Sequence, residues 1–437
     1  MKKFPPEFIE QLRSSVDIVE YIGQFVQLKK RGKNFIGLCP FHSEKTPSFS
    51  VSAEKQMYYC FGCGKGGSIY KFLDEFEKLT FPEAVQRLAE RAGIPLPKIH
   101  NDEQEISETE ELYEILRRTA KHFHDQLVHS NEGEFALEYL HKRKLSSDTI
   151  RKFGLGYAPR NWEFLVGKFR EENISLEFAE KVGVIKKRDD GSYYDTFRGR
   201  VTFPIFNTMG KVVGFGARKL YDDDNLGKYI NSSETPVYNK SKILYGLNFS
   251  KDAIREKENA ILVEGYADYL SLFQTGIENV IASSGTALTE EQIQLLSRFT
   301  RTVTILYDAD TAGSNAALRG VDLVLAKSLD VRIVQLPEGE DPDTFVQKFG
   351  KEEAEKRISN AISFIDFIAD SFLSRGKFST PEGMTEAVRS IVQSIAKIPD
   401  EIKREFFIKR VSEKYAIRES TLLLELEKQL QIGRAHV

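Results

Sequence analysis

The chain has 437 residues and a formal net charge of −3, with 41% hydrophobic and 29% charged residues. This length exceeds what one hydrophobic core supports, so about two to four domains are expected, and the composition is that of a globular protein. No apolar run is long enough to cross a membrane, and no apolar stretch of a signal peptide follows the first lysines. The sequence therefore predicts a cytoplasmic protein that makes no use of a membrane. A net charge near zero does not exclude nucleic acid, because a basic channel beside an acidic cluster averages out.

All three cysteines of the chain lie in one N-terminal motif. Cys39 and His42 form one pair and Cys60 and Cys63 form another, each pair with two intervening residues, and 17 residues separate the pairs. Three thiolates and one imidazole complete the closed tetrahedral shell of a structural zinc ion. The alternative of ordinary buried cysteines is disfavoured, because every cysteine of the chain falls in this pattern. The spacing predicts a zinc ribbon with one structural Zn²⁺.

Basic and aromatic residues surround this motif. Lys and Arg suit phosphates and aromatic rings suit base stacking, so together they indicate a surface for single-stranded nucleic acid. Several rings must nevertheless form the core of so small a domain, and we expect the basic residues rather than any particular ring to bind. The residues concerned are Lys29, Lys30, Arg31, Lys33, Lys45, Lys55 and Lys65, with Phe35, Phe41, Phe49, Tyr58, Tyr59 and Phe61.

The next part of the chain is polar, then helical, then mixed. Residues 99–111 are acidic and polar, which predicts a linker that leads into a helix. Apolar residues recur at helical spacing over 112–140. The segment 154–246 is rich in aromatic residues and glycines, and strands are expected at Val201–Phe206 and Val212–Phe215.

From residue 259 onward, apolar strands alternate with helical patterns, of which Ala312–Ser328 is one. This alternation predicts βαβ units around a parallel sheet. From about residue 344 to 430 the pattern is helical throughout. The expected strands are Ala260–Val263, Val280–Ala282, Val303–Tyr307 and Val331–Leu336.

Carboxylates follow three of these strands. Glu264 ends the first, Asp308 and Asp310 end the third, and Asp341 and Asp343 follow the last. The carboxyl ends of parallel strands share one edge of a sheet, and residues two apart in extended backbone point to the same side. We therefore expect these carboxylates to converge on one spot.

Such a density of negative charge calls for divalent cations, and carboxylate ligands favour Mg²⁺ or Mn²⁺ over zinc. Two such ions suit an in-line phosphoryl displacement. The alternative is that these acids are helix caps and loop residues. That alternative would be preferred for a single Asp-x-Asp, but not for three motifs at the ends of strands.

The Glu264-Gly265 pair at one strand end and Asp308-Ala309-Asp310 at another resemble the Toprim domain of primases, topoisomerases and some nucleases and recombination proteins. This resemblance implies metal-dependent phosphoryl chemistry and does not by itself choose a reaction.

The order of the parts is more specific. A zinc ribbon, a basic segment, a Toprim domain and then helices resemble the bacterial replicative (DnaG-type) primases along nearly the whole chain. The resemblance implies an enzyme that makes short RNA primers on single-stranded DNA from ribonucleoside triphosphates, a nucleotidyltransferase of the DNA-directed RNA polymerase kind, acting as a monomer. Motifs that carry it include Cys39–Phe49, Cys60–Gly67, Phe153–Pro159, Arg198–Ile205, Lys228–Pro236 and Gly285–Thr289.

The resemblance also implies roles for single residues. Glu264, Asp308 and Asp310 are the expected catalytic metal ligands, and Asp341 and Asp343 complete the site or hold a second ion. Basic residues of the family's active site should contact template or nucleotide phosphates. The matching positions are Arg143, Lys228 and Lys240, with Arg198, Arg200 and Lys242 as weaker candidates.

The expected fold is a multidomain α/β architecture with an N-terminal zinc ribbon, a mixed α+β basic subdomain, a Toprim parallel sheet and a C-terminal helical subdomain. The expected bounds are 1–98 for the ribbon, 99–111 for a linker, 112–258 for the basic part, 259–345 for Toprim, 346–431 for the helices and 432–437 for a tail foreign to the protein.

Two other functions fit parts of the pattern. A type IA topoisomerase shares Toprim, but usually carries it at the N-terminus and needs a nucleophilic tyrosine in a later domain, and only Tyr415 follows Tyr307 here. A non-catalytic recombination mediator also pairs a zinc finger with Toprim, but is much shorter.

Family members carry a further C-terminal helical domain that binds the replicative helicase. Here the helical pattern stops near Gln431 without a new domain, and residues 432–437 resemble translated sequencing adapter. We therefore expect a truncated chain that lacks the helicase-docking domain.

Overall fold

The computed structural model describes residues 4, 6–96, 103–221, 227–285, 287–374, 376 and 380–435, and the chain divides into two compact units, 1–107 and 108–437. None of the described helices is long and apolar enough to cross a membrane. The cytoplasmic location stays a prediction.

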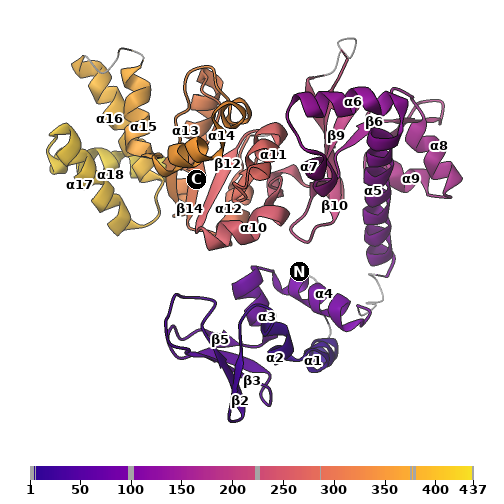
Figure 1. Cartoon of the computed structure of the whole chain (residues 1–437). Helices are drawn as coiled ribbons and strands as arrows, with labels where there is room; N and C mark the ends of the chain where they lie inside the picture. Colours follow the sequence, from indigo (N-terminus) through magenta and orange to yellow (C-terminus); the bar gives the residue numbers. More distant parts are fainter. Residues whose placement is uncertain are drawn as a thin grey trace. The chain divides into compact units, whose positions relative to one another are not determined.

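The first unit is a small antiparallel sheet with short helices (Figure 1). Its five strands follow one another in the order β1-β2-β3-β4-β5, and Phe49, Val51 and Tyr58 from β3 and β4 point into the core that the helices cover. The elements are α1 (Pro6–Ser15), α2 (Ile18–Ile22), β1 (Lys29–Arg31), β2 (Asn34–Gly37), β3 (Phe49–Ser52), β4 (Met57–Cys60), β5 (Gly66–Gly67), α3 (Ile69–Phe72), η1 (Leu73–Glu77) and α4 (Phe81–Ala92).

The second unit begins with helices around a four-stranded antiparallel sheet of order β11-β10-β9-β6 and a separate β7–β8 hairpin. The predicted strands near 201 and 212 are present as β9 and β10. The elements are α5 (Glu103–His129), α6 (Asn131–Lys142), α7 (Ser147–Lys152), β6 (Gly156–Ala158), α8 (Phe164–Glu171), α9 (Leu176–Lys181), β7 (Ile185–Lys187), β8 (Tyr193–Asp195), β9 (Arg200–Phe206), β10 (Val212–Lys219), β11 (Tyr229–Asn231), η2 (Lys240–Lys242) and α10 (Leu247–Glu256).

A second sheet follows, with the order β13-β12-β14-β15-β16, in which the first four strands are parallel. Side chains of β12 alternate between two cores: Ala260 and Leu262 lie in one, and Ile261 and Val263 lie in the other. Both faces are therefore covered by helices, as a parallel sheet requires. The elements are β12 (Asn259–Val263), α11 (Tyr266–Gln274), β13 (Val280–Ala282), α12 (Glu290–Leu296), β14 (Thr302–Ile305), α13 (Thr311–Ala326), β15 (Asp330–Ile333), α14 (Pro342–Ser359) and β16 (Ile362–Ser363).

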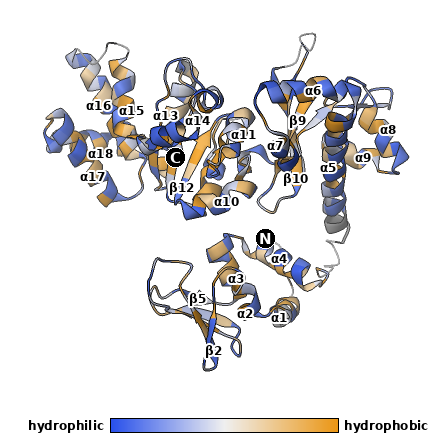
Figure 2. Cartoon of the chain, in the orientation of Figure 1, coloured by the Kyte–Doolittle hydropathy of each residue, from blue (hydrophilic) through white to orange (hydrophobic). Residues whose placement is uncertain are grey.

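The C-terminal helices pack against one face of this sheet. Ile391, Ile408 and Leu422 belong to the same core as Leu262 and Val303, so the helices extend the core of the sheet. Figure 2 shows β12 as hydrophobic and much of α17 as hydrophilic, as expected for an inner strand and an outer helix. The elements are α15 (Phe364–Leu373), α16 (Pro381–Ala396), α17 (Glu401–Tyr415) and α18 (Glu419–Ala435).

The predicted multidomain α/β class is confirmed, with local differences. The region after 344 is not helical throughout, because Ile362–Ser363 forms β16 and pairs antiparallel with the free edge of β15. Helix α5 already begins at Glu103, inside the expected linker 99–111, and α18 continues to Ala435, into the expected tail 432–437. Residues 99–102 of that linker and 436–437 of that tail lie outside the described residues.

Candidate functional site

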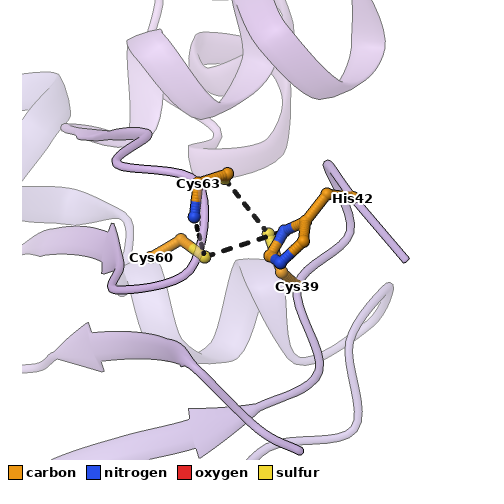
Figure 3. Close-up of side chains that lie close together, drawn as sticks. All are labelled: Cys39, His42, Cys60 and Cys63. Carbon is orange, nitrogen blue, oxygen red and sulfur yellow. Dashed lines mark hydrogen bonds between the residues drawn. The ribbon is translucent and has the colours of Figure 1, made fainter. Parts of the chain in front are cut away.

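The four predicted zinc ligands lie together (Figure 3). Cys39 and His42 come from the loop after β2, and Cys60 and Cys63 come from the end of β4 and the turn after it. One donor atom from each residue lies within 4.8 Å of the other three, and this is the single such cluster of Cys, His, Asp and Glu among the described residues. Burial opposes ionisation of Cys60, but hydrogen bonds from Ser48 and from the backbone lower the pKa of its thiol to about 7. This donor set suits zinc.

Glu44 supports this cluster from behind. Its Oε2 lies 3.3 Å from His42 Nε2, while His42 Nδ1 lies 3.9 Å from Cys60 Sγ, so the two ring nitrogens face different partners. Glu44 Oε1 also accepts hydrogen bonds from the backbone N–H groups of Cys39 at 2.7 Å and Ser48 at 3.1 Å. A carboxylate on the far nitrogen fixes the histidine tautomer that a metal needs.

The surface of this unit separates the rings that form the core from those that are exposed. Tyr58 and Phe49 are 1% and 0% exposed, whereas Tyr59 and Phe61 are 47% and 77% exposed and their rings lie 5.1 Å apart. Alternation along β4 separates Tyr58 from Tyr59, since successive side chains point to opposite faces, and Phe61 lies in the turn after β4. The β1–β2 hairpin exposes the four basic side chains Lys29, Lys30, Arg31 and Lys33.

Glu264 and Asp308 face each other at the edge of the parallel sheet. They follow β12 and β14, between which the strand order reverses, and this is the position where such sheets bind ligands. Glu264 Oε1 and Asp308 Oδ1 are buried and have no hydrogen-bond partner among the described residues. Burial, with Asp308 and Asp310 adding to it, raises the pKa of Glu264 to about 7. Burial, with Asp341 and Asp310, raises the pKa of Asp308 to about 6.

Asp310 and Asp341 have a second task at this edge, because each begins a helix. Asp310 Oδ1 accepts a hydrogen bond from Gly313 N at 2.6 Å at the start of α13, and Asp341 Oδ1 accepts one from Thr344 N at 2.6 Å at the start of α14. Helix capping, the alternative to metal binding for these acids, is therefore present at Asp310 and Asp341. It leaves one oxygen of each carboxylate outside the cap.

Asp343 lies elsewhere than the sequence predicted. Pro342 begins α14, so Asp343 lies in its first helical turn and does not share a side of an extended strand with Asp341. Its carboxylate is 2% exposed and contacts Arg143, Ser271 and Gln347. In this structure the predicted metal ligand Asp343 and the predicted phosphate ligand Arg143 are paired with each other.

Among the other predicted basic residues, Arg200 does not reach the surface. It is 1% exposed, and its Nη1 donates to the backbone oxygens of Ala217 at 3.3 Å and Gly227 at 3.1 Å. Its guanidinium is used inside the fold in this structure, and its predicted contact with phosphate stays a prediction. Lys228 is exposed and lowers the pKa of Asp308, so it lies toward the acidic edge. Lys240 lies in the short turn η2.

Arg198 belongs to a cluster of cations and rings on the β7–β8 side. Its guanidinium lies 3.8 Å from the ring centroid of Trp162, and the guanidinium of Arg188 lies 4.9 Å from that of Tyr194. The rings of Trp162 and Tyr194 are 5.7 Å apart, and Trp162 is 54% exposed. Exposed rings beside arginines are the groups on which proteins stack unpaired bases. Trp162 is the only tryptophan of the chain and was not among the residues predicted from the sequence.

Two further charged residues, Asp268 and Arg218, were not predicted from the sequence. Asp268 is buried in the first turn of α11, and burial together with Asp308, Asp341 and Asp343 raises its pKa to about 7. Arg218 stacks 4.8 Å from the centroid of Tyr139, and its Nε and Nη1 are buried without hydrogen-bond partners among the described residues. The signal for Asp268 was available, because it lies in the same motif as Glu264. Arg218 had none, since a basic residue at the end of a strand is ordinary.

Comparison with protein families accounts for most of the chain. Residues 4–104 match the CHC2 zinc finger, residues 122–251 match the N-terminal domain of the DNA primase catalytic core, and residues 261–346 match a Toprim-like domain. Residues 365–420 match the DnaB-helicase binding domain of primase.

Individual proteins agree with these matches. The DNA primase of Halalkalibacterium halodurans is 39% identical over 443 residues, which cover 99% of this chain and 74% of that protein. A crystal structure of the zinc-binding and RNA polymerase domains of the Aquifex aeolicus primase matches with a TM-score of 0.66 and 37% identity, covering 95% of this chain and 99% of that one. A DnaG primase catalytic domain bound to single-stranded DNA matches with a TM-score of 0.62 and 34% identity, covering 70% and 99%.

A CHC2 zinc finger followed by a Toprim-like catalytic core defines a class of enzymes that act on nucleic acid. Within that class, the chain belongs to the DNA primase family, and its function is that of a DNA primase.

One expectation is overturned by these comparisons. The sequence predicted that the helicase-docking domain is missing, but residues 365–420, which span α15 to α17, match a DnaB-helicase binding domain. The prediction was wrong because it rested only on the length of the helical region and on the residue where the helical pattern stops. The helices next to the sheet were therefore assigned to the catalytic core and not to helicase binding.

Proposed function

We propose that the edge formed by Glu264, Asp308 and Asp310 catalyses nucleotidyl transfer that builds RNA primers on single-stranded DNA. The observation that carries this proposal is the pair of buried, unpartnered carboxylate oxygens of Glu264 and Asp308 at the point where the strand order reverses. Buried acids without partners are costly, and their raised pKa values reflect that cost. Such oxygens suit hard divalent cations.

Glu264, Asp308 and Asp310 would hold the first ion, and the free oxygen of Asp341 is the best candidate for a second. Mg²⁺ or Mn²⁺ at this edge would neutralise charge on the phosphates and orient the attacking and leaving oxygens. Asp343 would join only if its contact with Arg143 opened. The side chain of Lys228, which lies toward Asp308, would bind the triphosphate and offset its charge.

Template binding is assigned to two surfaces, one in each unit. In the second unit, Trp162 and Arg198 offer a ring and a cation to unpaired bases and phosphates, and a related primase catalytic domain binds single-stranded DNA. In the first unit, the basic β1–β2 hairpin and the exposed ring of Phe61 offer the same chemistry. The zinc ion held by Cys39, His42, Cys60 and Cys63 would maintain the surface of the first unit.

The helical region 365–420 is assigned to helicase binding. Its family match supports this role, and α17 exposes Ile402 and Phe406, 69% and 68% exposed, one helical turn apart. Addition of a DnaB-type helicase should therefore raise primer yield. The double variant I402S/F406S should show a smaller rise in primer yield with helicase, and its synthesis without helicase should be unchanged. An equal rise in the wild type and the double variant would refute this assignment.

We keep the domain bounds predicted from the sequence as a proposal. The one change is that the linker 99–111 becomes helical at Glu103, where α5 begins. De novo incorporation of labelled ribonucleotides on bare single-stranded templates tests the reaction. Primers should form with either Mg²⁺ or Mn²⁺ and disappear in the E264Q variant. Synthesis by E264Q at the wild-type rate would refute the proposed metal site.

A further inference from the structure

Asn231 bridges the antiparallel sheet and the Toprim domain. It ends β11, and its side chain makes two hydrogen bonds across the junction. Tyr266 Oη donates to Asn231 Oδ1 at 2.7 Å, and Asn231 Nδ2 donates to the backbone oxygen of Ser284 at 2.9 Å. Both polar atoms of one amide are therefore used to hold two Toprim segments together.

The two segments are those that flank Glu264. Tyr266 is two residues after it and begins α11. Ser284 is far away in sequence, but its N–H donates to the backbone oxygen of Glu264 at 2.9 Å. Asn231 therefore contacts the side chain of Tyr266, two residues after Glu264, and the backbone of Ser284, which hydrogen-bonds to the Glu264 backbone.

The Ser284 contact needs an external support. Ser284 has a φ of 59°, in the left-handed region that a non-glycine residue adopts at a cost. Such conformations persist only where the surroundings fix them. The amide of Asn231 supplies a hydrogen bond to the carbonyl of this strained residue.

The junction is shaped for the Tyr266 ring. Gly216 pairs with Asn231 in the sheet, and a Cβ at Gly216 would lie 2.3 Å from Tyr266 Cζ. The ring stacks on Phe203 with an interplanar angle of 13° and a centroid distance of 5.0 Å. Tyr266 is 2% exposed, so its hydroxyl group needs a buried acceptor, and Asn231 provides it.

We propose that Asn231 is a positioning residue for Glu264: through the Tyr266 side chain and the Ser284 backbone it fixes the chain at and just after that carboxylate, so that a divalent cation finds it in place. This inference rests on the proposed metal role of Glu264. Ionised Glu264 is repelled by Asp308 and Asp310, and a backbone free to move would let the carboxylate turn away from them. Loss of Asn231 should thus weaken cation binding rather than nucleotide binding.

The test compares N231A, N231D and Y266F in the full chain. N231D keeps the acceptor for Tyr266 and loses the donor to Ser284, whereas Y266F keeps the donor and loses the other bond. The measurements are Mn²⁺ binding by electron paramagnetic resonance, the Mg²⁺ concentration for half-maximal primer synthesis, kcat, and KM for ribonucleotide. We expect N231A and N231D to weaken Mn²⁺ binding and raise the Mg²⁺ midpoint about 10-fold, with KM changed less than about twofold. Y266F should show a smaller shift.

A purely structural role would lower thermal stability and leave the metal midpoint of the folded fraction unchanged. N207A is the matched control for such a role. The side chain of Asn207 also holds backbone groups, since its Oδ1 accepts from Met209 N and Lys211 N, both at 3.0 Å. Wild-type Mn²⁺ binding by N231D and Y266F would overturn the proposal, even if N231A failed to fold. E264Q separates the two hypotheses: if it loses Mn²⁺ while the Asn231 variants keep it, only the positioning role fails. If E264Q also keeps Mn²⁺, the proposed metal site fails.

Discussion

Asp310 shows how one residue serves both folding and chemistry. One oxygen caps α13 through Gly313 N, and the charge of the group raises the pKa values of Glu264 and Asp308. The two tasks respond differently to substitution, since a cap needs an oxygen and a metal needs a charge.

The first prediction separates these tasks with D310N. Asparagine caps a helix about as well as aspartate, so the free energy of unfolding should change by about 1 kcal/mol or less. Primer synthesis should fall at least about 100-fold, because the uncharged amide is a poor ligand for a hard cation. D310A is the control that should lose both the cap and the activity. Near wild-type synthesis by D310N would remove Asp310 from the metal site.

Glu44 leads to a second prediction, on zinc retention. E44Q keeps the size of the side chain but removes the charge beside His42 Nε2, so the histidine loses the partner that fixes its tautomer. Zinc release to a chelator should accelerate about 10-fold, measured with a colorimetric indicator. E54Q is a matched control, because Glu54 is an exposed glutamate of the same unit. Equal release rates for E44Q and wild type would exclude a supporting role.

Asp195 leads to a third prediction, on stability and pH. It is 1% exposed, and burial raises its pKa to about 7 although Leu165 N and Val166 N donate to it. Because the folded pKa lies above the unfolded value of 3.8, the stability it contributes is full below about pH 4 and is lost as pH rises toward 7.

D195N does not titrate and serves as the reference. The free energy of unfolding of wild type, minus that of D195N, should fall by up to about 1.4 kcal/mol per pH unit between pH 5 and 7. Urea denaturation at several pH values measures this difference. A difference that rises or stays flat across this range would show that the folded pKa is not raised.

At the scale of elements, the positions of the strands were easier to predict from the sequence than the contacts of the side chains that follow each strand. β13 has the predicted bounds, because Val280–Ala282 is a short apolar run between polar residues. β14 ends at Ile305 rather than Tyr307, since the chain leaves the ladder to bring Asp308 to the sheet edge. The motif spacing predicted the cluster of Cys39, His42, Cys60 and Cys63, which the structure brings together, and it predicted the place of Glu264 at the end of β12. It could not identify the Arg143–Asp343 pair, because 200 residues separate the partners.

The β7–β8 hairpin is the element that carries the fourth prediction. W162A removes an exposed ring but no charge, so affinity for single-stranded DNA should fall roughly fivefold or more, with little change in its salt dependence. R188A should instead reduce the slope of affinity against salt. Fluorescence anisotropy with a labelled oligonucleotide measures both. F406A, at another exposed ring on α17, is the control and should bind as wild type does.

At the scale of the whole molecule, the chain consists of two compact units that have separate cores. The core of the first unit includes the zinc ligands Cys39 and Cys60 beside Phe49 and Tyr58, so the metal cluster is part of this core. A structural zinc ion commonly supplies about 10–16 kcal/mol of apparent binding free energy, so we expect this unit to depend on its metal for folding. The second unit contains no part of the zinc cluster, and its two large cores connect sheet and helices.

The last prediction follows from this difference and uses C60S. Serine is a poor zinc ligand, so metal content should fall from about one zinc per chain to near zero. Calorimetry should then show the transition of residues 1–107 lost or moved far down, while the transition of residues 108–437 keeps its temperature. Mn²⁺ binding at Glu264 should persist, because its ligands belong to the second unit, whereas template recognition through the β1–β2 hairpin should be lost. If C60S also unfolded the second unit, the two cores would not be independent, and the division of labour proposed between ribbon and catalytic core would have to be abandoned.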